Sequence, residues 1–499
     1  MDREGQGALV IRAAILAIGL CACTDSATAV APAIDIPIND SASAFPLESI
    51  TLSVAHEGAA DDLTSAKFVS GAAVELAGVP FGDDLVIHMT GRVGTSEVAY
   101  GRTCSFSVGQ RSPPPIPHLL FSRSVRFAQL ATEPELQPLL RKNGVAITYH
   151  DGSGLLLGGV DPSDPTSAIA DIERFDPRTG ELRLLATVQN RLGAVAAPLG
   201  IAADAHVALI GGIDPSTGSG ATFVELIEAE NPADRRVERI DDAQMDRIGL
   251  TATALTDGRV IAIGGMRPPS DPPSNAVDEV SLSNGTAVVR TLRAQLVRPR
   301  TGHTATRLGD DVGAAVLVAG GLDAAKVPVG AAELFKPLSE DFSKAFTATM
   351  VVPRSHHEAV RMPDGSVLIL GGVDAAGAPV LTLELFTLDA GFVKLVQRLP
   401  INAGVLELSA TTLRDGRVLL TGGRLSPGGP AVDTAFIANL DPIDGSVNVV
   451  ATDHLSVPRA GHQATLLCDG TVLITGGTSA PSPAERYNPP GSDRSFGRR

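Results

Sequence analysis

Glycine pairs recur along this chain at nearly constant spacing, and each pair ends a short apolar run. Consecutive pairs are 51 to 56 residues apart and begin at Gly158, Gly211, Gly264, Gly320, Gly371, Gly422 and Gly476. Most are preceded by an Asp-Gly dipeptide, which favours the two-residue turns that join antiparallel strands. Two further strand-like segments follow most pairs, as in 171–177 and 180–186. The sequence therefore predicts one unit of four antiparallel strands, repeated seven times.

Four short strands cannot bury both faces alone, but they can when copies stack radially into a ring. This predicts an all-β fold with a seven-bladed β-propeller over residues 118–490. The last repeat stops soon after Tyr487, before any fourth strand. The segment Ser124 to Ala131 is similar to the fourth strands of other repeats, so we expect it to complete the last blade from the N-terminal side.

The glycine pair, the acidic-aromatic third strand (for example 331–337) and the repeat length resemble the kelch family. Members of that family form β-propellers, and the resemblance covers about three-quarters of the chain. It implies a rigid ring that presents variable loops. The chain has no tryptophan, although many kelch repeats carry one in the last strand, so leucine and valine must pack the outer strands.

The N-terminus resembles an export signal. Residues 13–20 are apolar but too short to span a bilayer, which is typical of a signal-peptide core. The following LCAC, Leu20 to Cys23, resembles the lipobox of bacterial lipoproteins and implies cleavage before Cys23 and acylation of its thiol. An ordinary cleaved signal is the alternative. We expect a signal peptide over 1–22, export to the bacterial cell envelope, and anchoring at the outer membrane by lipid alone.

A small β domain is expected between this anchor and the ring. Residues 23–44, rich in Ala, Ser, Asp and Pro, predict a lipidated flexible tether. Residues 45–110 alternate apolar and polar positions, and 79–108 resembles the immunoglobulin-like β-sandwiches of bacterial surface lipoproteins. This alternation predicts that His88 lies on the surface. The proline-rich segment 111–117 predicts a stiff linker, and 491–499 a tail.

Charged residues recur at two positions of the repeat. Six repeats have an arginine three residues before a position that we call the histidine slot: Arg141, Arg191, Arg247, Arg300, Arg354 and Arg459. The same six have a glutamate on the third strand: Glu173, Glu225, Glu279, Glu333, Glu384 and Glu485. The remaining repeat has Val405 and Ala438. Because both charges are lost together, the sequence predicts Arg–Glu pairs of structural rather than catalytic role.

The histidine slot lies at the start of the expected innermost strand. It holds His303, His357 and His462, with Gly144, Ala194, Leu250 and Leu408 in the other repeats. Small and apolar replacements favour a packing role. His356 and His357 should be neighbours on a strand, so they would point to opposite faces and could not hold one metal ion together.

Two cysteines lie in the expected domains, Cys104 in the small domain and Cys468 in the last repeat. Because they are far apart in the chain, we expect buried free thiols rather than a disulfide.

Composition limits the function. A net charge of −16 opposes binding to nucleic acid, and the common nucleotide, zinc-protease and nucleophile-elbow motifs are missing from the sequence. No catalytic residue, metal ligand or cofactor is predicted. Copper chemistry of the galactose oxidase kind is disfavoured, because the ring contains just Tyr149, Tyr487 and Cys468 for it.

The sequence therefore favours a non-catalytic exported lipoprotein that binds a protein partner through its propeller loops. A carbohydrate-binding protein and a kelch-type sugar mutarotase stay open as alternatives, because either needs few recognisable residues.

Overall fold

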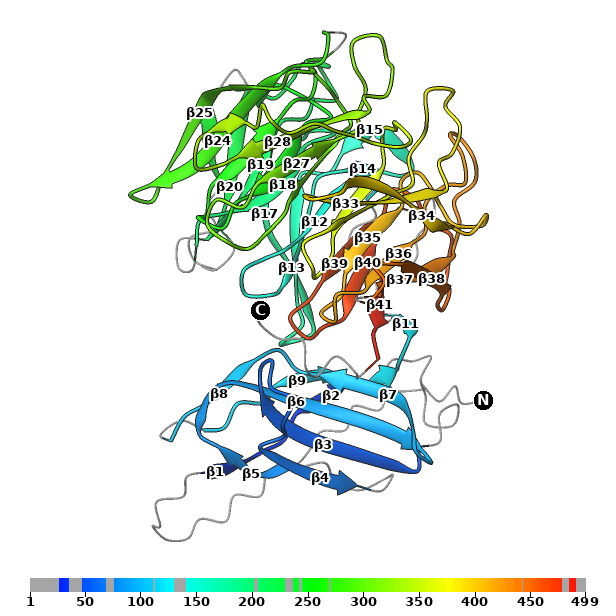
Figure 1. The fold of residues 1–499 in the computed structure, drawn as a ribbon. Helices are drawn as coiled ribbons and strands as arrows, with labels where there is room; N and C mark the ends of the chain where they lie inside the picture. Colours follow the sequence, from blue (N-terminus) through cyan, green and yellow to red (C-terminus); the bar gives the residue numbers. More distant parts are fainter. Residues whose placement is uncertain are drawn as a thin grey trace, which may run out of the picture.

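A computed structural model of the chain describes residues 27–35, 47–68, 76–110, 113–129, 141–201, 205–228, 237–241, 245–268, 271–441, 443–477 and 484–490. Over these residues the fold is all-β, without an α-helix, and a small β domain lies against one end of a larger body (Figure 1). Within the described part, no helix has the length and apolar character needed to cross a membrane. The expected signal peptide, the acylation site Cys23 and the tail lie outside the described residues.

The small domain is built around one large antiparallel sheet with strand order β10-β7-β6-β3-β4, in which β8 also pairs with β6. Two short strand pairs, β1-β5 and β2-β9, complete the domain. Its strands are β1 (Ala27–Val30), β2 (Ala33–Asp35), β3 (Ser49–His56), β4 (Thr64–Phe68), β5 (Leu76–Pro80), β6 (Gly82–Val93), β7 (Ser96–Arg102), β8 (Phe106–Val108), β9 (His118–Leu120) and β10 (Ser122–Arg123). Leu85, Ile87 and Met89 of β6 lie in its core, as the alternation predicts.

The small domain takes in more of the chain than its expected range of 45–110. The segment expected to be a flexible tether contains β1 and β2, because Val30 and Ile34 have apolar side chains that pack into the core. Strands β9 and β10, expected to belong to the ring, pair with β2 and β7 of the small domain instead.

His88 is buried, so the expectation that it lies on the surface is wrong. Its Nδ1 lies 2.5 Å from the hydroxyl of Tyr100. The alternation of β6 correctly assigns one face to the core, but the other face is also covered, since Val86, His88 and Thr90 are all buried. A period-two pattern cannot predict that the second face of β6 is also buried, because the residues that cover this face are remote in sequence.

The larger body consists of four-stranded antiparallel sheets, one of which gains a fifth strand, β30. The described residues form seven such sheets, numbered here by their first strand along the chain. Sheet 1 contains β12 (Val145–Thr148), β13 (Gly154–Leu157), β16 (Asp171–Asp176) and β17 (Glu181–Thr187), and sheet 2 contains β18 (Val195–Leu199), β19 (His206–Ile210), β20 (Phe223–Ile227) and β21 (Val237–Asp241). Sheet 3 contains β22 (Thr251–Ala254), β23 (Val260–Ile263), β24 (Ala276–Ser283) and β25 (Thr286–Gln295). Sheet 4 contains β26 (Thr304–Arg307), β27 (Val316–Ala319), β28 (Ala331–Lys336), β29 (Asp341–Phe342) and β30 (Ala348–Thr349).

The remaining three sheets follow the same order. Sheets 5 to 7 contain β31 (Glu358–Arg361), β32 (Val367–Leu370), β33 (Thr382–Thr387) and β34 (Gly391–Arg398); β35 (Ser409–Thr412), β36 (Val418–Thr421), β37 (Ala435–Leu440) and β38 (Val447–Ala451); and β39 (Gln463–Leu466), β40 (Val472–Thr475), β41 (Glu485–Asn488) and β11 (Arg126–Gln129). A separate hairpin of β14 (Val160–Asp161) and β15 (Asp164–Ala168) follows the first glycine pair.

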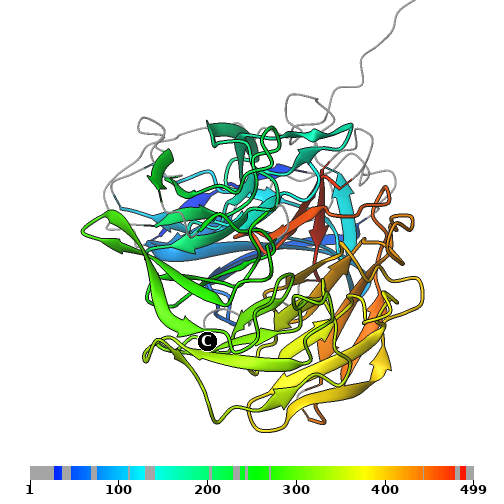
Figure 2. The same cartoon turned by 90° about the horizontal axis from the view of Figure 1, so that it is seen from above.

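These sheets close into a ring, which is a β-propeller-like architecture. The first strand of each sheet lies beside the first strands of its two neighbours, and β39 of sheet 7 lies beside β12 of sheet 1. Seen from above, the sheets surround a common centre (Figure 2). Strand β11 pairs with β41 over all four of its residues, which confirms that the N-terminal segment completes the last sheet.

The sheets share one pattern of strand burial. The second strand is fully buried, as in β32, whereas the first strand is half-buried because it lines the centre of the ring. Between them, an Asp-Gly turn is fixed by its aspartate: in sheet 5, Asp364 accepts hydrogen bonds from the backbone amide and the hydroxyl of Ser366. Apolar clusters fill the space between neighbouring sheets, so no sheet has a core of its own.

Candidate functional site

A buried arginine in six of the seven sheets is paired with a carboxylate on the third strand of its own sheet. The pairs are Arg141–Glu173 at 2.5 Å, Arg300–Glu333 at 2.6 Å, Arg354–Glu384 at 2.5 Å and Arg459–Glu485 at 2.9 Å, together with Arg191–Glu225 and Arg247–Asp278. The repeated Arg–Glu pairing predicted from the sequence is confirmed in five sheets. In the sixth the partner is Asp278, so the prediction of Glu279 is wrong.

The exchange of Asp278 for Glu279 has a local cause. Asp278 of β24 lies opposite Ala262, the second residue before the glycine pair, and the paired glutamates of the other sheets occupy this same position, as Glu384 does opposite Ile369. Asp278 therefore points toward Arg247, whereas Glu279 forms ion pairs with Arg259 and Arg290. In the remaining sheet, Val405 is at the arginine position, but the carboxylate position opposite Leu420 is occupied by Phe436 and not by the expected Ala438; all of these residues lie in one apolar cluster.

Each arginine also satisfies backbone groups around it. The guanidinium of Arg354 donates to the carbonyl oxygens of Gly371 and Thr382, and Glu384 accepts the backbone amides of Val351 and Val352. Burial lowers the pKa of Arg354, and the facing carboxylate of Glu384 opposes that shift. All polar atoms of this pair are directed at scaffold atoms, so the arrangement fastens the strands and leaves no group for catalysis.

The glycine pairs link one sheet to the next. The second glycine of a pair donates its amide to the carbonyl oxygen three residues before the next histidine slot, as in Gly321 to Arg354 at 3.0 Å. The same bond from Gly477 to Arg141, at 2.9 Å, joins sheet 7 to sheet 1. Both glycines of each pair have positive φ angles, a conformation that side chains other than glycine rarely adopt.

The three slot histidines are packing residues, as expected from the sequence. His303, His357 and His462 are buried, and burial lowers the pKa of each to about 3, so the rings are neutral at physiological pH. Each Nε2 lies within hydrogen-bond distance of a threonine hydroxyl: Thr251, Thr304 and Thr421, respectively. Among the described residues, no group of three or more His, Cys, Asp or Glu side chains is arranged to hold a metal ion.

His356 is not on a strand, contrary to expectation. It lies in the turn before β31 with a φ of 54°, and its side chain is exposed while that of His357 is buried. The two rings do point to different environments, as predicted, but the turn rather than strand alternation separates them.

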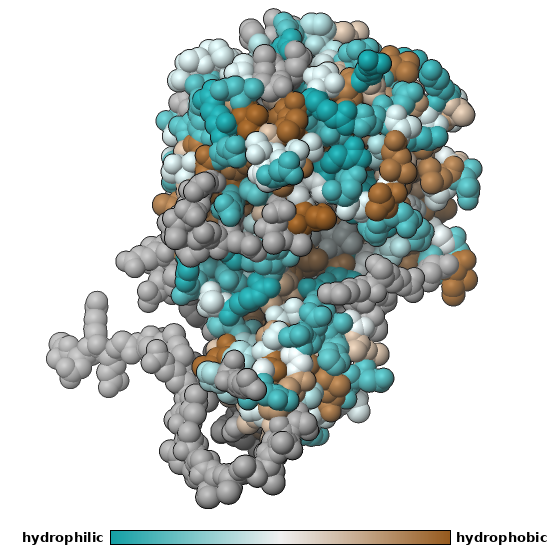
Figure 3. Space-filling view, turned by 90° about the vertical axis from the view of Figure 1, so that its left-hand side faces the viewer, coloured by the Kyte–Doolittle hydropathy of each residue, from teal (hydrophilic) through white to brown (hydrophobic). Residues whose placement is uncertain are grey.

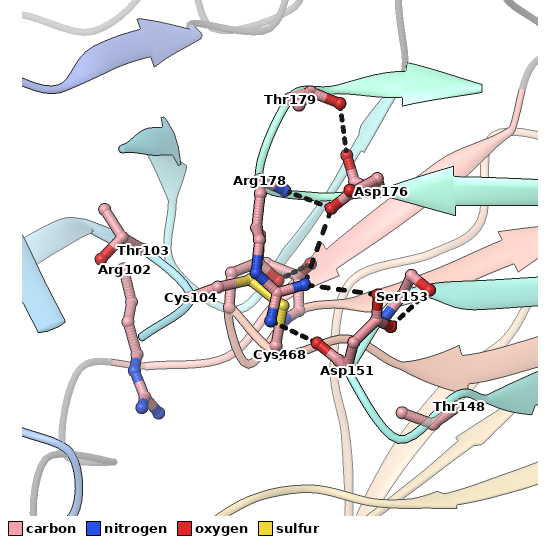
Figure 4. The surroundings of a disulfide bond; sticks show 12 residues. Arg102, Thr103, Cys104, Thr148, Asp151, Ser153, Asp176, Arg178, Thr179 and Cys468 are labelled. Atoms are coloured by element: carbon pink, nitrogen blue, oxygen red, sulfur yellow. Dashed lines mark hydrogen bonds and ion pairs between the residues drawn. A yellow bond between two sulfur atoms is a disulfide. The ribbon is translucent and has the colours of Figure 1, made fainter. Parts of the chain in front are cut away.

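The end of the ring that carries the Asp-Gly turns is covered by the small domain. Cys104 and Cys468 form a disulfide with their Cα atoms 5.0 Å apart, so the expectation of two free thiols is wrong (Figure 4). Sequence distance misled the prediction, since the ring closes and brings its last sheet back to the domain that precedes it. The sulfur of Cys468 is also unavailable for a cross-link to a tyrosine of the copper-oxidase kind.

Polar contacts surround this disulfide. Glu57 of the small domain accepts hydrogen bonds from Arg102 and from Arg414 of sheet 6, both at 3.0 Å. Burial raises the pKa of Glu57, but the two arginines outweigh it and hold that pKa below its usual value. The side-chain amide of Asn488 in β41 donates to the backbone oxygens of Tyr100 and Ser122. The small domain is thus bonded to the ring at several points.

The opposite end of the ring carries the loops that follow the glycine pairs. Backbone bridges close these loops at their base, for example Leu322 with Pro328 and Arg424 with Ala431. Around the centre of this end lies a ring of residues with positive φ, one before each histidine slot: Asn143, Gly193, Gly249, Gly302, His356, Glu407 and Gly461. Three of them are not glycine, and strained backbone of this kind is often found at functional sites.

Side chains of opposite charge gather at this open end. Glu407 lies 3.1 Å from Arg424 of its own sheet and 3.5 Å from Lys142 of sheet 1. His356 and Glu407 are exposed. We regard this open end, with its loops, as the candidate functional site. The sequence patterns described above do not single out these residues, although the shared position before the histidine slot could have revealed them.

The side of the ring offers no comparable surface on the face shown in Figure 3. Apolar side chains there form small separate groups among polar ones, both on the ring and on the small domain. Such scattered apolar residues are usual for a protein surface.

The chain was compared with protein families, curated protein sequences and solved structures. No protein-family model matches the chain, and no curated protein sequence does so. Solved structures do resemble it, among them one described as "Structure of YjhT", with 13% identity and a TM-score of 0.43. That similarity covers 71% of this chain and 95% of the other.

Proposed function

We propose that the protein is an exported, lipid-anchored, seven-bladed propeller of the kelch type that binds a protein partner through the open end of its ring. The observation that carries this proposal is that the two ends of the ring differ: one is attached to the small domain and the other is open. The small domain, the Cys104–Cys468 disulfide and the Glu57 ion pairs occupy one end. The loops after the glycine pairs remain for recognition at the other end, held on a rigid ring.

The disulfide supports export. Disulfides form and persist in oxidising compartments such as the bacterial periplasm and the cell surface, and they are rare in the cytosol. An acylated Cys23 followed by the small domain would hold the ring outside the cytoplasm, with the open end away from the attached domain. The net charge of −16 favours partners other than nucleic acids and anionic membrane surfaces.

Site-specific photo-crosslinking in the native cells tests the binding face. A photoreactive residue would replace Ala376 or Pro427, both exposed in open-end loops, and Val396 on the outer strand β34 would serve as an exposed control. We expect the same protein adduct from both loop positions and none from Val396. Adducts from Val396 alone, or from all three positions equally, would contradict the proposal.

The lipid anchor is tested separately. Cys23→Ser should abolish incorporation of labelled palmitate and release the protein from the membrane fraction, whereas Cys21→Ser, in the segment expected to be removed, should leave both unchanged. Continued lipid labelling of the Cys23→Ser protein would show that the N-terminal anchor has been misassigned.

A further inference from the structure

The residue after each histidine slot begins the innermost strand of its sheet and meets the slot residue of the next sheet. The hydroxyl of Thr251 lies 3.2 Å from His303, and that of Thr304 lies 3.0 Å from His357. The residue in the histidine slot lies in the same place relative to the preceding sheet whether or not it is a histidine. A Cβ on Gly264 would meet the ring of His303, and a Cβ on Gly371 would meet the side chain of Leu408 in the same way.

Hydroxyl–histidine contacts of this kind occur at two junctions, Thr251 with His303 and Thr304 with His357. At two other junctions the residues at these positions are apolar, Val145 with Ala194 and Val195 with Leu250. At the junction of sheets 5 and 6 the pair is Glu358 with Leu408. A carboxyl group there faces methyl groups, which cannot donate a hydrogen bond.

Glu358 has no partner for its carboxyl group in the described part of the protein. Burial alone acts on it and raises its pKa to about 7, although the side chain is half-buried rather than fully enclosed. A group that lies deep in the molecule and still reaches solvent must line the centre of the ring. An unpaired carboxylate in such surroundings is costly, because no nearby charge or donor compensates for lost hydration.

The charged and titratable groups around Glu358 do not supply that compensation. On its own strand and turn are His356 and His357, whose pKa values are lowered by burial, and Arg361, which pairs with Asp310 at 2.7 Å. Next to β31, sheet 4 contributes the neutral His303 and Arg307, and Arg307 pairs with Asp310 at 3.1 Å. Strand β35 of sheet 6 has only Ser, Ala and Thr.

We propose that Glu358 anchors a binding site in the centre of the ring for an organic ligand that carries a protonated amine. The ammonium group would supply the missing charge and hydrogen-bond donors, and the half-buried Val145 and Val195, which begin the innermost strands of sheets 1 and 2, would contact the rest of the ligand. The net charge of −16 favours the approach of cations. This site goes beyond the proposed function, because it lies within the ring and does not involve the open-end loops.

Calorimetric titration of the whole soluble chain from residue 24 tests the proposal with n-butylammonium, which stays charged between pH 6 and pH 8, and with neutral n-butanol. The carboxylate form of Glu358 rises over this range, so n-butylammonium should bind about tenfold more tightly at pH 8 than at pH 6. n-Butanol should show no such change. Glu358→Gln should remove the preference for the amine at both pH values.

Glu340→Gln is the matched control, since it makes the same charge change at a carboxylate already paired with Arg290 on the outside of the ring. It should bind n-butylammonium as the original protein does. Equal binding of amine and alcohol, or an amine preference that survives Glu358→Gln, would overturn the proposal. Because the loops are untouched, a failure here leaves the crosslinking test of the open end unaffected.

Discussion

At the scale of single residues, the structure depends on buried charges that each find a fixed partner. The sequence predicts five of the six repeated ion pairs because both charges are missing together from the repeat with Val405 and Ala438. It fails at Asp278, since spacing alone cannot tell which of two adjacent acidic residues lies opposite the second residue before the glycine pair. It also passes over Glu358, because the chemical match between neighbouring sheets is visible only when the slot positions are placed side by side.

The Arg300–Glu333 pair allows a direct test of the repeated ion pairs. Glu333→Ala leaves a buried guanidinium without its carboxylate and removes the acceptor of the Val297 and Arg298 amides, so we expect a loss of about 3–5 kcal/mol. Arg300→Val should cost a similar amount. The double variant, which removes both charges together, should lose less than the sum. Urea unfolding measures all three, and strict additivity would contradict pairing.

Glu358→Gln should change the pH dependence of stability. The folded state raises the pKa of this carboxyl from 4.5 to about 7, so the folded protein binds its proton more tightly than the unfolded chain. Stability is therefore lost as pH rises from about 4.5 to 7. The glutamine variant should be more stable by about 3 kcal/mol at pH 8 and equal to the original protein at pH 4. Parallel pH profiles from denaturant unfolding would disprove this.

At the scale of structural elements, periodicity predicts the strands and turns well but not what lies beside them. Asp-Gly turns and the apolar second strands follow from local sequence, because turn chemistry and burial act over a few residues. Whether the second face of a strand is covered depends on distant residues, and so β6 with its buried His88 was predicted incorrectly. The strands β1 and β2 were missed because each is short and gains stability from β5 and β9.

A turn can require glycine for two reasons: a positive φ angle, or a close contact where a Cβ would lie. Gly422 and Gly428 allow these two reasons to be tested separately. Both have positive φ, 54° and 67°, so alanine should cost about 1 kcal/mol at either through backbone strain. A Cβ at Gly428 would meet nothing within 4 Å, whereas one at Gly422 would lie 2.4 Å from the carbonyl oxygen of Arg459. Gly422→Ala should therefore cost about 1–3 kcal/mol more. Equal midpoints in thermal unfolding would show that the sheets do not need this close approach.

At the scale of the whole molecule, the repeat length and the missing fourth strand predict a ring closed from the N-terminal side. The attachment of the small domain cannot be predicted in this way. Cys104 and Cys468 are 364 residues apart, and no local pattern relates them. Their proximity follows from ring closure itself: β11 leaves the small domain to pair with β41, so the last sheet must return to that domain. The disulfide and the pairing of β11 with β41 therefore both join the last sheet to the small domain.

The disulfide should stabilise the ring as one unit. It closes a loop that contains sheets 1 to 6 and part of sheet 7, and Cys468 also donates its amide to Gly152 of sheet 1 across the junction. Limiting the freedom of so long an unfolded loop is worth about 2–5 kcal/mol. A Cys104→Ser, Cys468→Ser double variant should lose this amount in urea unfolding, and the original protein should match it after reduction.

The loss of the disulfide should affect sheets 7 and 1 first, because β11, β41 and the Gly152 turn meet there. Hydrogen exchange of β40 and β13 should accelerate more than that of β23 and β27, on the far side of the ring. Uniform acceleration would mean that the disulfide acts on the unfolded chain alone, and an unchanged urea midpoint would mean that β11 closes the ring without it.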